Sequence, residues 1–109
     1  MTFKDLIKKY SKNDVIFTSH AKFRLLDKTF EANFVIDKLF ETSKLLYEEY
    51  QKERKTYKLI YEHSKDFFFV IIVNLNEKIM IVTFYKTNKK IQKLIKEGGV
   101  VYVSKKFKE

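Results

Sequence analysis

The 109-residue sequence contains no cysteine and no proline, and its only two glycines are adjacent, at Gly98 and Gly99. Without cysteine the chain can form neither a disulfide framework nor a thiolate metal site, and this composition fits a reducing cytosol. Two histidines, His20 and His63, are too few for a histidine-rich metal site. We therefore expect a cytoplasmic protein that folds without disulfides, binds no metal and uses no other cofactor.

Long apolar segments are also missing. The longest apolar run, residues 67–73, is far shorter than the ~20 residues that a membrane-spanning helix needs. The first residues lack the apolar core and cleavage site of a signal peptide. We expect no membrane contact and interpret the run as a buried strand. The length suits one domain over residues 1–109, with its core at about 15–90 and a flexible tail at 104–109.

Positive charge is what the sequence has in excess. Lysine and arginine number 23 against 14 acidic residues, which gives a net charge of +9. A surface of this kind suits RNA or another nucleic acid, or an acidic protein partner. A lysine-rich composition is also typical of an AT-rich genome, so the charge by itself does not choose between function and codon bias.

Helical spacing of apolar residues is found near both ends of the chain. In the first segment, residues 2–10, apolar side chains recur one turn apart and Thr2 can serve as the N-cap. Thr18 or Ser19 can cap a second helix. A last helix can be capped by Asn88 and ended by the glycine pair. The predicted helices cover residues 2–10, 19–27, 31–41 and 88–96.

Between these helices the pattern changes to that of strands, predicted at residues 45–51, 56–63, 67–75 and 79–85. Residues 67–75 are apolar on both faces, which is typical of a central strand. The connections are short, with Asn74 or Asn76 available for a left-handed turn, so neighbouring strands should be antiparallel. Residues 15–17 are interpreted as an extended entry segment and 100–103 as a short edge strand. The expected fold class is α+β, with N-terminal helices packed on a four-stranded antiparallel sheet and a C-terminal helix.

The most specific local pattern is Thr18-Ser19-His20-Ala21-Lys22-Phe23-Arg24. On a helix His20 and Arg24 are four residues apart, with Cβ atoms ~5–6 Å apart on one face. An imidazole beside a guanidinium can act as a base next to a phosphate-binding group. The same spacing is also typical of an ordinary solvent-exposed helix face, so spacing alone leaves both interpretations open.

The order of elements resembles the RelE/ParE-like toxin superfamily, in particular small domains allied to the BrnT toxins. In those domains a short strand leads to His-Ala-x-x-Arg at the start of a helix. A second helix follows, and then three or four strands that end in a segment like Val-Thr-x-Tyr. The matching segments here are His20-Ala21-Lys22-Phe23-Arg24 and Val82-Thr83-Phe84-Tyr85. The resemblance covers about residues 15–90.

This resemblance implies a toxin that binds RNA and cleaves it without a metal ion, kept in check by a small acidic antitoxin. In that reaction the ribose 2′-oxygen attacks the adjacent phosphate, which requires a base, an acid and cations. The resemblance assigns catalytic roles to His20, Arg24 and Tyr85. ParE relatives bind gyrase instead, so a non-catalytic nucleic-acid-binding or protein-interaction module on the same fold is the alternative. Either would be a monomer or a homodimer.

A second group of candidates combines tyrosines with basic residues on the sheet. By strand alternation Tyr57, Tyr61 and His63 share one face and Lys58 lies on the other. If the helices cover only one side of the sheet, the tyrosine face can be open and can stack unpaired bases. Tyrosines at the boundary of a core show the same pattern. The candidate nucleic-acid-binding residues are Lys28, Arg54, Tyr57, Lys58, Tyr61, His63 and Lys86.

Overall fold

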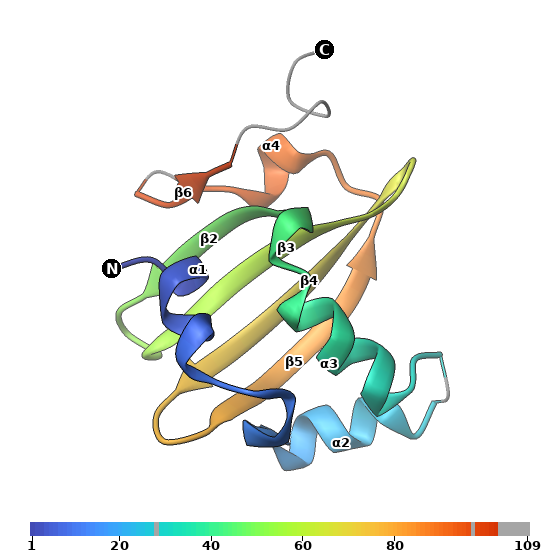
Figure 1. The fold of residues 1–109 in the computed structure, drawn as a ribbon. Coiled ribbons are helices and arrows are strands. Elements are labelled where there is room, and N and C mark those ends of the chain that lie inside the picture. The colour runs from blue at the N-terminus through green and yellow to red at the C-terminus, as the bar shows by residue number, and fades with distance from the viewer. Residues whose placement is uncertain (28, 97, 103–109) are drawn as a thin grey trace.

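A computed structural model describes residues 1–27, 29–96 and 98–102 of the chain. Short helices and longer strands follow one another from the N-terminus (Figure 1). Their bounds are α1 Phe3–Leu6, β1 Val15–Phe17, α2 Ser19–Leu25, α3 Ala32–Phe40, β2 Leu45–Gln51, β3 Thr56–Ser64, β4 Phe67–Leu75, β5 Ile79–Thr87, α4 Ile91–Leu94 and β6 Val100–Val101. Single 3-10 turns lie at Ile7–Lys9, Lys12–Asp14 and Thr42–Lys44.

The described strands form one six-stranded sheet in the order β1-β5-β4-β3-β2-β6. Strands β2 to β5 are neighbours in chain order and pair antiparallel, as their short connections predict. Strand β6 joins β2 antiparallel, whereas β1 pairs with β5 in parallel. The α+β class is confirmed. The expectation of a four-stranded antiparallel sheet is wrong, because the sheet is mixed and has two further strands.

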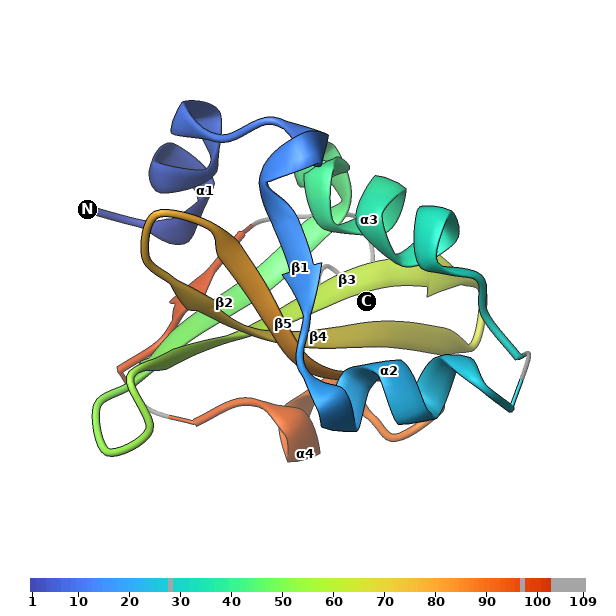
Figure 2. The same cartoon turned by 90° about the horizontal axis from the view of Figure 1, so that it is seen from below.

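The parallel strand β1 corresponds to residues 15–17, for which the sequence predicted an extended segment but no place in the sheet. Its register pairs Val15 with Ile79, Ile16 with Met80 and Phe17 with Ile81. Parallel neighbours need a long connection. Here that connection is everything from α2 to β4, so the first strand and the last long strand meet at one edge (Figure 2).

The two faces of the sheet are covered unequally. Helices α1 and α3 lie over one face, α4 lies on the other, and α2 runs beside the edge formed by β1 and β5 (Figures 1 and 2). The large core under α1 and α3 includes Val35, Leu39, Leu59, Phe69 and Ile71. The smaller cluster under α4 consists of Tyr47, Ile60, Val70, Ile91 and Leu94. Strand β4 contributes buried residues to both, which confirms the central position predicted from its apolar run.

A buried carboxylate joins both ends of the described chain to the sheet. Glu48 in β2 accepts hydrogen bonds from the backbone N–H groups of Phe3 and Lys4, at the start of α1. The Tyr102 hydroxyl donates to the same carboxylate over 2.6 Å. The first N–H groups of a helix have no partner within the helix, so an acidic side chain from the sheet stabilises this end of α1.

Turns and caps agree with expectation only in part. Thr2 and Thr18 cap α1 and α2 as predicted. Asn88 is not the cap of α4, which begins only after Lys90 and is four residues long. Among the described non-glycine residues the left-handed conformation occurs at Lys55 (φ 55°), so the prediction of such a turn at Asn74 or Asn76 is wrong.

The expected tail, residues 104–109, and the last residue of the predicted 100–103 strand lie outside the described residues. No helix in the described part of the chain is both long and apolar enough to cross a membrane.

Candidate functional site

Helix α2 is fixed to the sheet through its cap. The Thr18 hydroxyl accepts a hydrogen bond from the Ala21 N–H (3.2 Å) and donates to the carbonyl of Val82 in β5 (3.1 Å). The Thr18 N–H also donates to the carbonyl of Ile81. Ala21 is fully buried against the core. His20 and Arg24 therefore lie on the exposed side of α2. The position of α2 along β5 is set by the hydrogen bonds from Thr18 to the carbonyls of Ile81 and Val82.

Residues of α2 and β5 enclose a small cavity, which we call the Arg24 cavity. Its volume is about 250 Å³, and its lining comes from the end of α2, the loop that follows and the end of β5. The residues that line it are Arg24, Asp27, Thr29, Phe30, Phe84, Tyr85 and Lys86. Three residues predicted for the site, Arg24, Tyr85 and Lys86, thus meet at one place although some 60 positions separate the helix from the strand.

The charges around this cavity act on two of its groups. Burial raises the pKa of the Tyr85 hydroxyl, and the positive charge of Arg24 partly opposes that rise. The pKa of Asp27 is lowered, first by the hydrogen bond from the Thr29 backbone N–H and also by the charge of Arg24. The Lys86 ammonium lies 4.6 Å from the centre of the Phe67 ring. The lining of the cavity therefore includes two cationic residues and one carboxylate residue. The ring of Tyr85 itself packs against the cluster under α4, and its hydroxyl is protonated at neutral pH.

The other predicted residues are spread over the molecule. His20 is exposed on the first turn of α2, one turn before Arg24, and does not line the cavity. Arg54 lies in the turn between β2 and β3, at the other end of the sheet. Lys28 lies outside the described residues. Asp27, Thr29 and Phe30 complete the cavity, and the only sequence signal for them is their place directly after the His-Ala-x-x-Arg helix.

The expectation of an open tyrosine face is wrong, because helices cover that face of the sheet. Tyr61 is fully buried and its hydroxyl donates to the carbonyl of Leu39 over 2.7 Å. Tyr57 is partly buried against the same core. His63 packs near aromatic rings of α3, its preceding loop and β4: Phe30, Phe34 and Phe69. Tyr61 is thus a core residue and cannot stack a base.

Lys58 has a structural role on the opposite face. Its ammonium donates to the carbonyl of Leu94, at the C-terminal end of α4, over 2.9 Å. Burial lowers the pKa of this lysine, although Glu49 acts in the other direction. The side chain is therefore already engaged, and it is a weaker candidate for nucleic acid than the sequence indicated.

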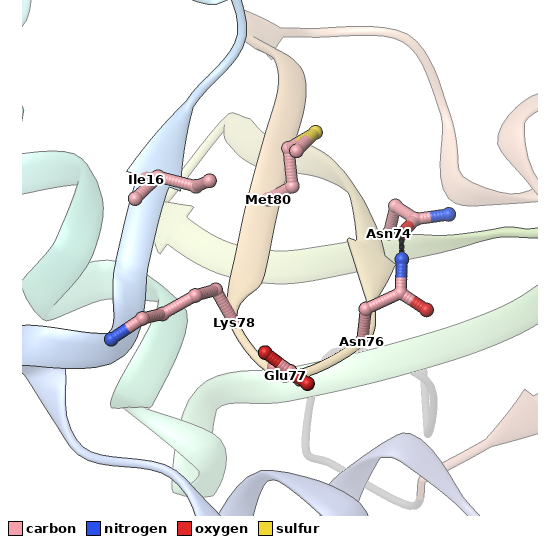
Figure 3. Close-up of a pocket in the computed structure, with 6 residues that line it drawn as sticks. All are labelled: Ile16, Asn74, Asn76, Glu77, Lys78 and Met80. Atoms are coloured by element: carbon pink, nitrogen blue, oxygen red, sulfur yellow. Dashed lines mark hydrogen bonds between the residues drawn. The ribbon is translucent and has the colours of Figure 1, made fainter.

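A larger hollow, about 690 Å³ in volume, lies at the turn between β4 and β5 (Figure 3). Ile16 and Met80 form its apolar side, and Glu77 and Lys78 border it. The Lys78 ammonium lies 3.5 Å from the carboxylate of Asp14. Lys78 is the one cation among the described residues that line this hollow, so the hollow is less suited to a phosphate than the Arg24 cavity is. Within the described ranges, no three histidine, cysteine or acidic side chains are grouped so that they could hold a metal ion.

No protein-family model, no curated protein and no solved structure matches this chain. The resemblance to the RelE/ParE-like superfamily therefore stays an expectation from the sequence, based on the order of elements and on the two segments at His20–Arg24 and Val82–Tyr85.

Proposed function

We propose that this domain binds RNA and that the Arg24 cavity holds a phosphate of the RNA backbone. The observation that carries the proposal is the common position of Arg24, Tyr85 and Lys86 around one hollow. A guanidinium donates two parallel hydrogen bonds to phosphate oxygens, a lysine adds a second positive charge, and a protonated phenol can donate a third bond. The net charge of +9 favours the approach of any polyanion.

The size of the cavity indicates which part of a nucleotide it suits. At about 250 Å³ it is below the ~300–1,000 Å³ that enclose a drug-sized ligand. A phosphate with part of a ribose is small enough. Phe30, which is partly exposed, contributes apolar surface against which a sugar can pack. Recognition would then follow the backbone, with little dependence on base sequence.

Cleavage of the bound RNA is the second part of the proposal, and it draws on the resemblance to metal-independent toxins. The 2′-oxygen would attack phosphorus while its proton passes to the His20 imidazole. The bond between phosphorus and the 5′-oxygen would break, and the leaving oxygen would take its proton from Tyr85. Arg24 would stabilise the charge that develops on the phosphate in the transition state. The raised pKa of Tyr85 keeps its proton in place until the more basic leaving oxygen forms.

Two charge-matched variants test binding. Arg24→Gln and Lys22→Gln each remove one positive charge from the exposed side of α2, and only Arg24 lines the cavity. We expect Arg24→Gln to weaken binding of a short single-stranded RNA by roughly 10–100-fold, the effect of losing a charged hydrogen bond. Lys22→Gln should weaken it by less than about 3-fold, because it acts through long-range charge alone. Equal losses in the two variants would refute a phosphate site at Arg24.

Cleavage is tested on His20. We expect His20→Ala to slow cleavage by roughly 10²–10⁴, the usual contribution of a positioned acid or base. Arg24→Lys should also slow it, because a single ammonium cannot replace the bidentate guanidinium. Since both side chains are exposed, the thermal midpoint of unfolding should not change. A lower midpoint with unchanged RNA cleavage would show that these residues are structural.

A second candidate function is the binding of an acidic protein, and a separate observation favours it. Phe23 on the outer side of α2 and Leu26 directly after the helix are 75% and 72% exposed, near Lys22. Neighbouring apolar side chains that are this exposed are typical of interaction sites. A small acidic amphipathic partner, of the kind an antitoxin supplies, would match both the apolar pair and the charge.

Co-expression with an adjacent gene product of that kind tests this candidate. The partner should co-purify with the wild type and be lost from the Phe23→Ser, Leu26→Ser double variant, while RNA binding by the isolated double variant is retained. Loss of RNA binding in that variant would instead assign the apolar pair to the RNA site.

A further inference from the structure

A third hollow lies at the opposite end of the sheet from the Arg24 cavity, next to the larger hollow at the β4–β5 turn, with which it shares Asn74 and Asn76. It is bordered by the first 3-10 turn, the β2–β3 turn and the end of β4, and its volume is about 540 Å³. Three tyrosines line it together with one lysine and two asparagines: Tyr10, Tyr50, Tyr57, Lys55, Asn74 and Asn76. We call it the tyrosine hollow. Nothing in the sequence indicates that these residues lie together, because they come from four separate segments.

The tyrosine rings converge from different elements. Tyr50 and Tyr57 lie on paired strands with ring centres 5.0 Å apart and planes inclined at 54°. The Tyr10 hydroxyl donates to the backbone carbonyl of Asn76 over 2.6 Å, which fixes this third ring against the β4–β5 turn. The pKa of Tyr57 is raised, mainly by burial and also by the nearby Tyr50 hydroxyl, the Glu48 carboxylate and the Tyr10 hydroxyl. Tyr50 remains 49% exposed, so one ring is accessible to a ligand.

The polar side of the hollow is equally ordered. The Asn74 amide donates to the carbonyl of Lys55 over 2.9 Å, and the Asn76 amide donates to the Asn74 side-chain oxygen over 2.8 Å. These bonds hold the two turns together. In Figure 3, which draws the hollow at the β4–β5 turn, the oxygen of Asn76 is directed away from Asn74. Lys55 is the only charged side chain among the described residues that line the hollow.

We infer that the tyrosine hollow binds a nucleobase that carries a phosphate. Tyrosine rings stack on the flat face of a base, an asparagine side chain can bond the edge of the base, and a lysine neutralises the phosphate. The described lining carries no carboxylate that would repel an anion. A volume of about 540 Å³ lies within the range of small-molecule sites, unlike that of the smaller Arg24 cavity.

This inference does not rest on the proposed function. Strand β5 runs from Ile79, near the tyrosine hollow, to Tyr85 at the Arg24 cavity. At ~3.3 Å per residue this length of strand separates the two sites by about 20 Å. A single nucleotide therefore cannot occupy both sites. The base can come from a free nucleotide or from a strand of RNA, and the chemistry of recognition is the same for both.

The test is a titration of the full chain with adenosine monophosphate, followed by the amide signals in an NMR spectrum. We expect saturable shifts at residues 50–57 and 74–76. Ribose 5-phosphate, which has the phosphate without the base, should leave these signals unchanged. Tyr50→Ala should weaken binding roughly 5–150-fold, the range for loss of one stacked base, and Tyr50→Phe should retain it. Phe34→Leu, which removes a partly exposed ring on α3, should have no effect.

Several outcomes would overturn the inference: equal shifts with ribose 5-phosphate, unchanged affinity in Tyr50→Ala, or shifts confined to the Arg24 cavity. Lys55→Gln gives a second measurement, since it should weaken adenosine monophosphate binding and leave adenosine binding unchanged. If the NMR shifts at the tyrosine hollow persist in Arg24→Gln, this site binds its ligand independently of the phosphate site at Arg24. If a short oligoadenylate binds more tightly than the mononucleotide and shifts residues 50–57, the natural ligand is an RNA strand. If only the mononucleotide saturates the site, the natural ligand is a free nucleotide.

Discussion

The two faces of the sheet are stabilised in different ways. Under α1 and α3 the sheet is covered by a continuous cluster of buried aliphatic and aromatic side chains. Under α4 the apolar cluster is smaller, and hydrogen bonds supplement it. Lys58 donates to the carbonyl of Leu94, and the Tyr47 hydroxyl accepts from the Lys96 N–H over 3.1 Å. Gly99 passes so close to the Tyr47 ring that any side chain there would overlap it.

This difference teaches how much each face contributes to the stability of the whole fold. Burial of apolar surface scales with area and dominates folding, whereas a hydrogen bond contributes only about 0.5–1.5 kcal/mol after its competition with water. Segments with few buried contacts open locally at low free energy. We therefore expect the α1–α3 face to determine global unfolding, and α4 with the chain that follows it to open separately.

The largest effect is expected from Ile71→Ala. Ile71 is fully buried in β4, on the face under α1 and α3, so its truncation should lower the free energy of unfolding by ~2–5 kcal/mol through lost burial and a cavity. Denaturant titration measures this loss. Ile91→Ala in α4 provides the comparison, because Ile91 belongs to the smaller cluster and is slightly exposed. A loss in Ile91→Ala equal to that in Ile71→Ala would break the distinction between the two faces.

Much of the sheet could be predicted from the sequence. The bounds of β2 and β4 agree with the predicted strands, and β3 and β5 are only one and two residues longer. These strands have clear alternation or an apolar run, and short turns force them to pair with their neighbours. The pairing of β1 could not be predicted, since three residues carry no pattern that names a distant partner. Helix α4 is shorter than predicted because the chain leaves it to pass Tyr47 and join β2.

The candidate site could be predicted less well than the sheet. Arg24 and Tyr85 were each indicated by the sequence, but their common cavity depends on the hydrogen bonds that bind Thr18 to β5. Contacts between residues some 60 positions apart leave no local signal. Strand alternation placed Tyr57 and Tyr61 on one face correctly, but it could not reveal that this face is the covered one.

A smaller effect, with a pH dependence, is expected from Tyr61→Phe on the α1–α3 face. Near neutral pH the loss of the buried bond to Leu39 should cost ~1–3 kcal/mol. Burial raises the pKa of Tyr61 well above 10.0, so above about pH 10 the unfolded chain loses this proton while the folded chain keeps it. The free energy of unfolding therefore falls as the pH rises above that value.

Because Tyr61→Phe has no such proton, the stability difference between wild type and variant should shrink from about pH 9 to about pH 11. Denaturant titrations at both pH values measure the difference. A difference that stays constant with pH would mean that Tyr61 ionises equally in the folded and unfolded chains. The α1–α3 face would then be more accessible to solvent than the burial of Tyr61 indicates.

The smallest effect is expected from Lys58→Met on the α4 face. Methionine keeps most of the apolar stem of the lysine and removes the ammonium that bonds the carbonyl of Leu94. We expect global stability to change by less than ~1.5 kcal/mol, the contribution of one hydrogen bond. Amide exchange of residues 91–96 should nevertheless accelerate, because the end of α4 has lost its anchor to β3, while exchange in β4 should stay unchanged. Burial of the Lys58 ammonium is unfavourable, as its lowered pKa indicates. The variant no longer buries this charge, and this gain offsets part of the stability lost with the hydrogen bond. If amide exchange accelerates equally in α4 and β4, the two faces unfold as one unit. The faces would then differ in the kinds of contact that they contain and not in their stability.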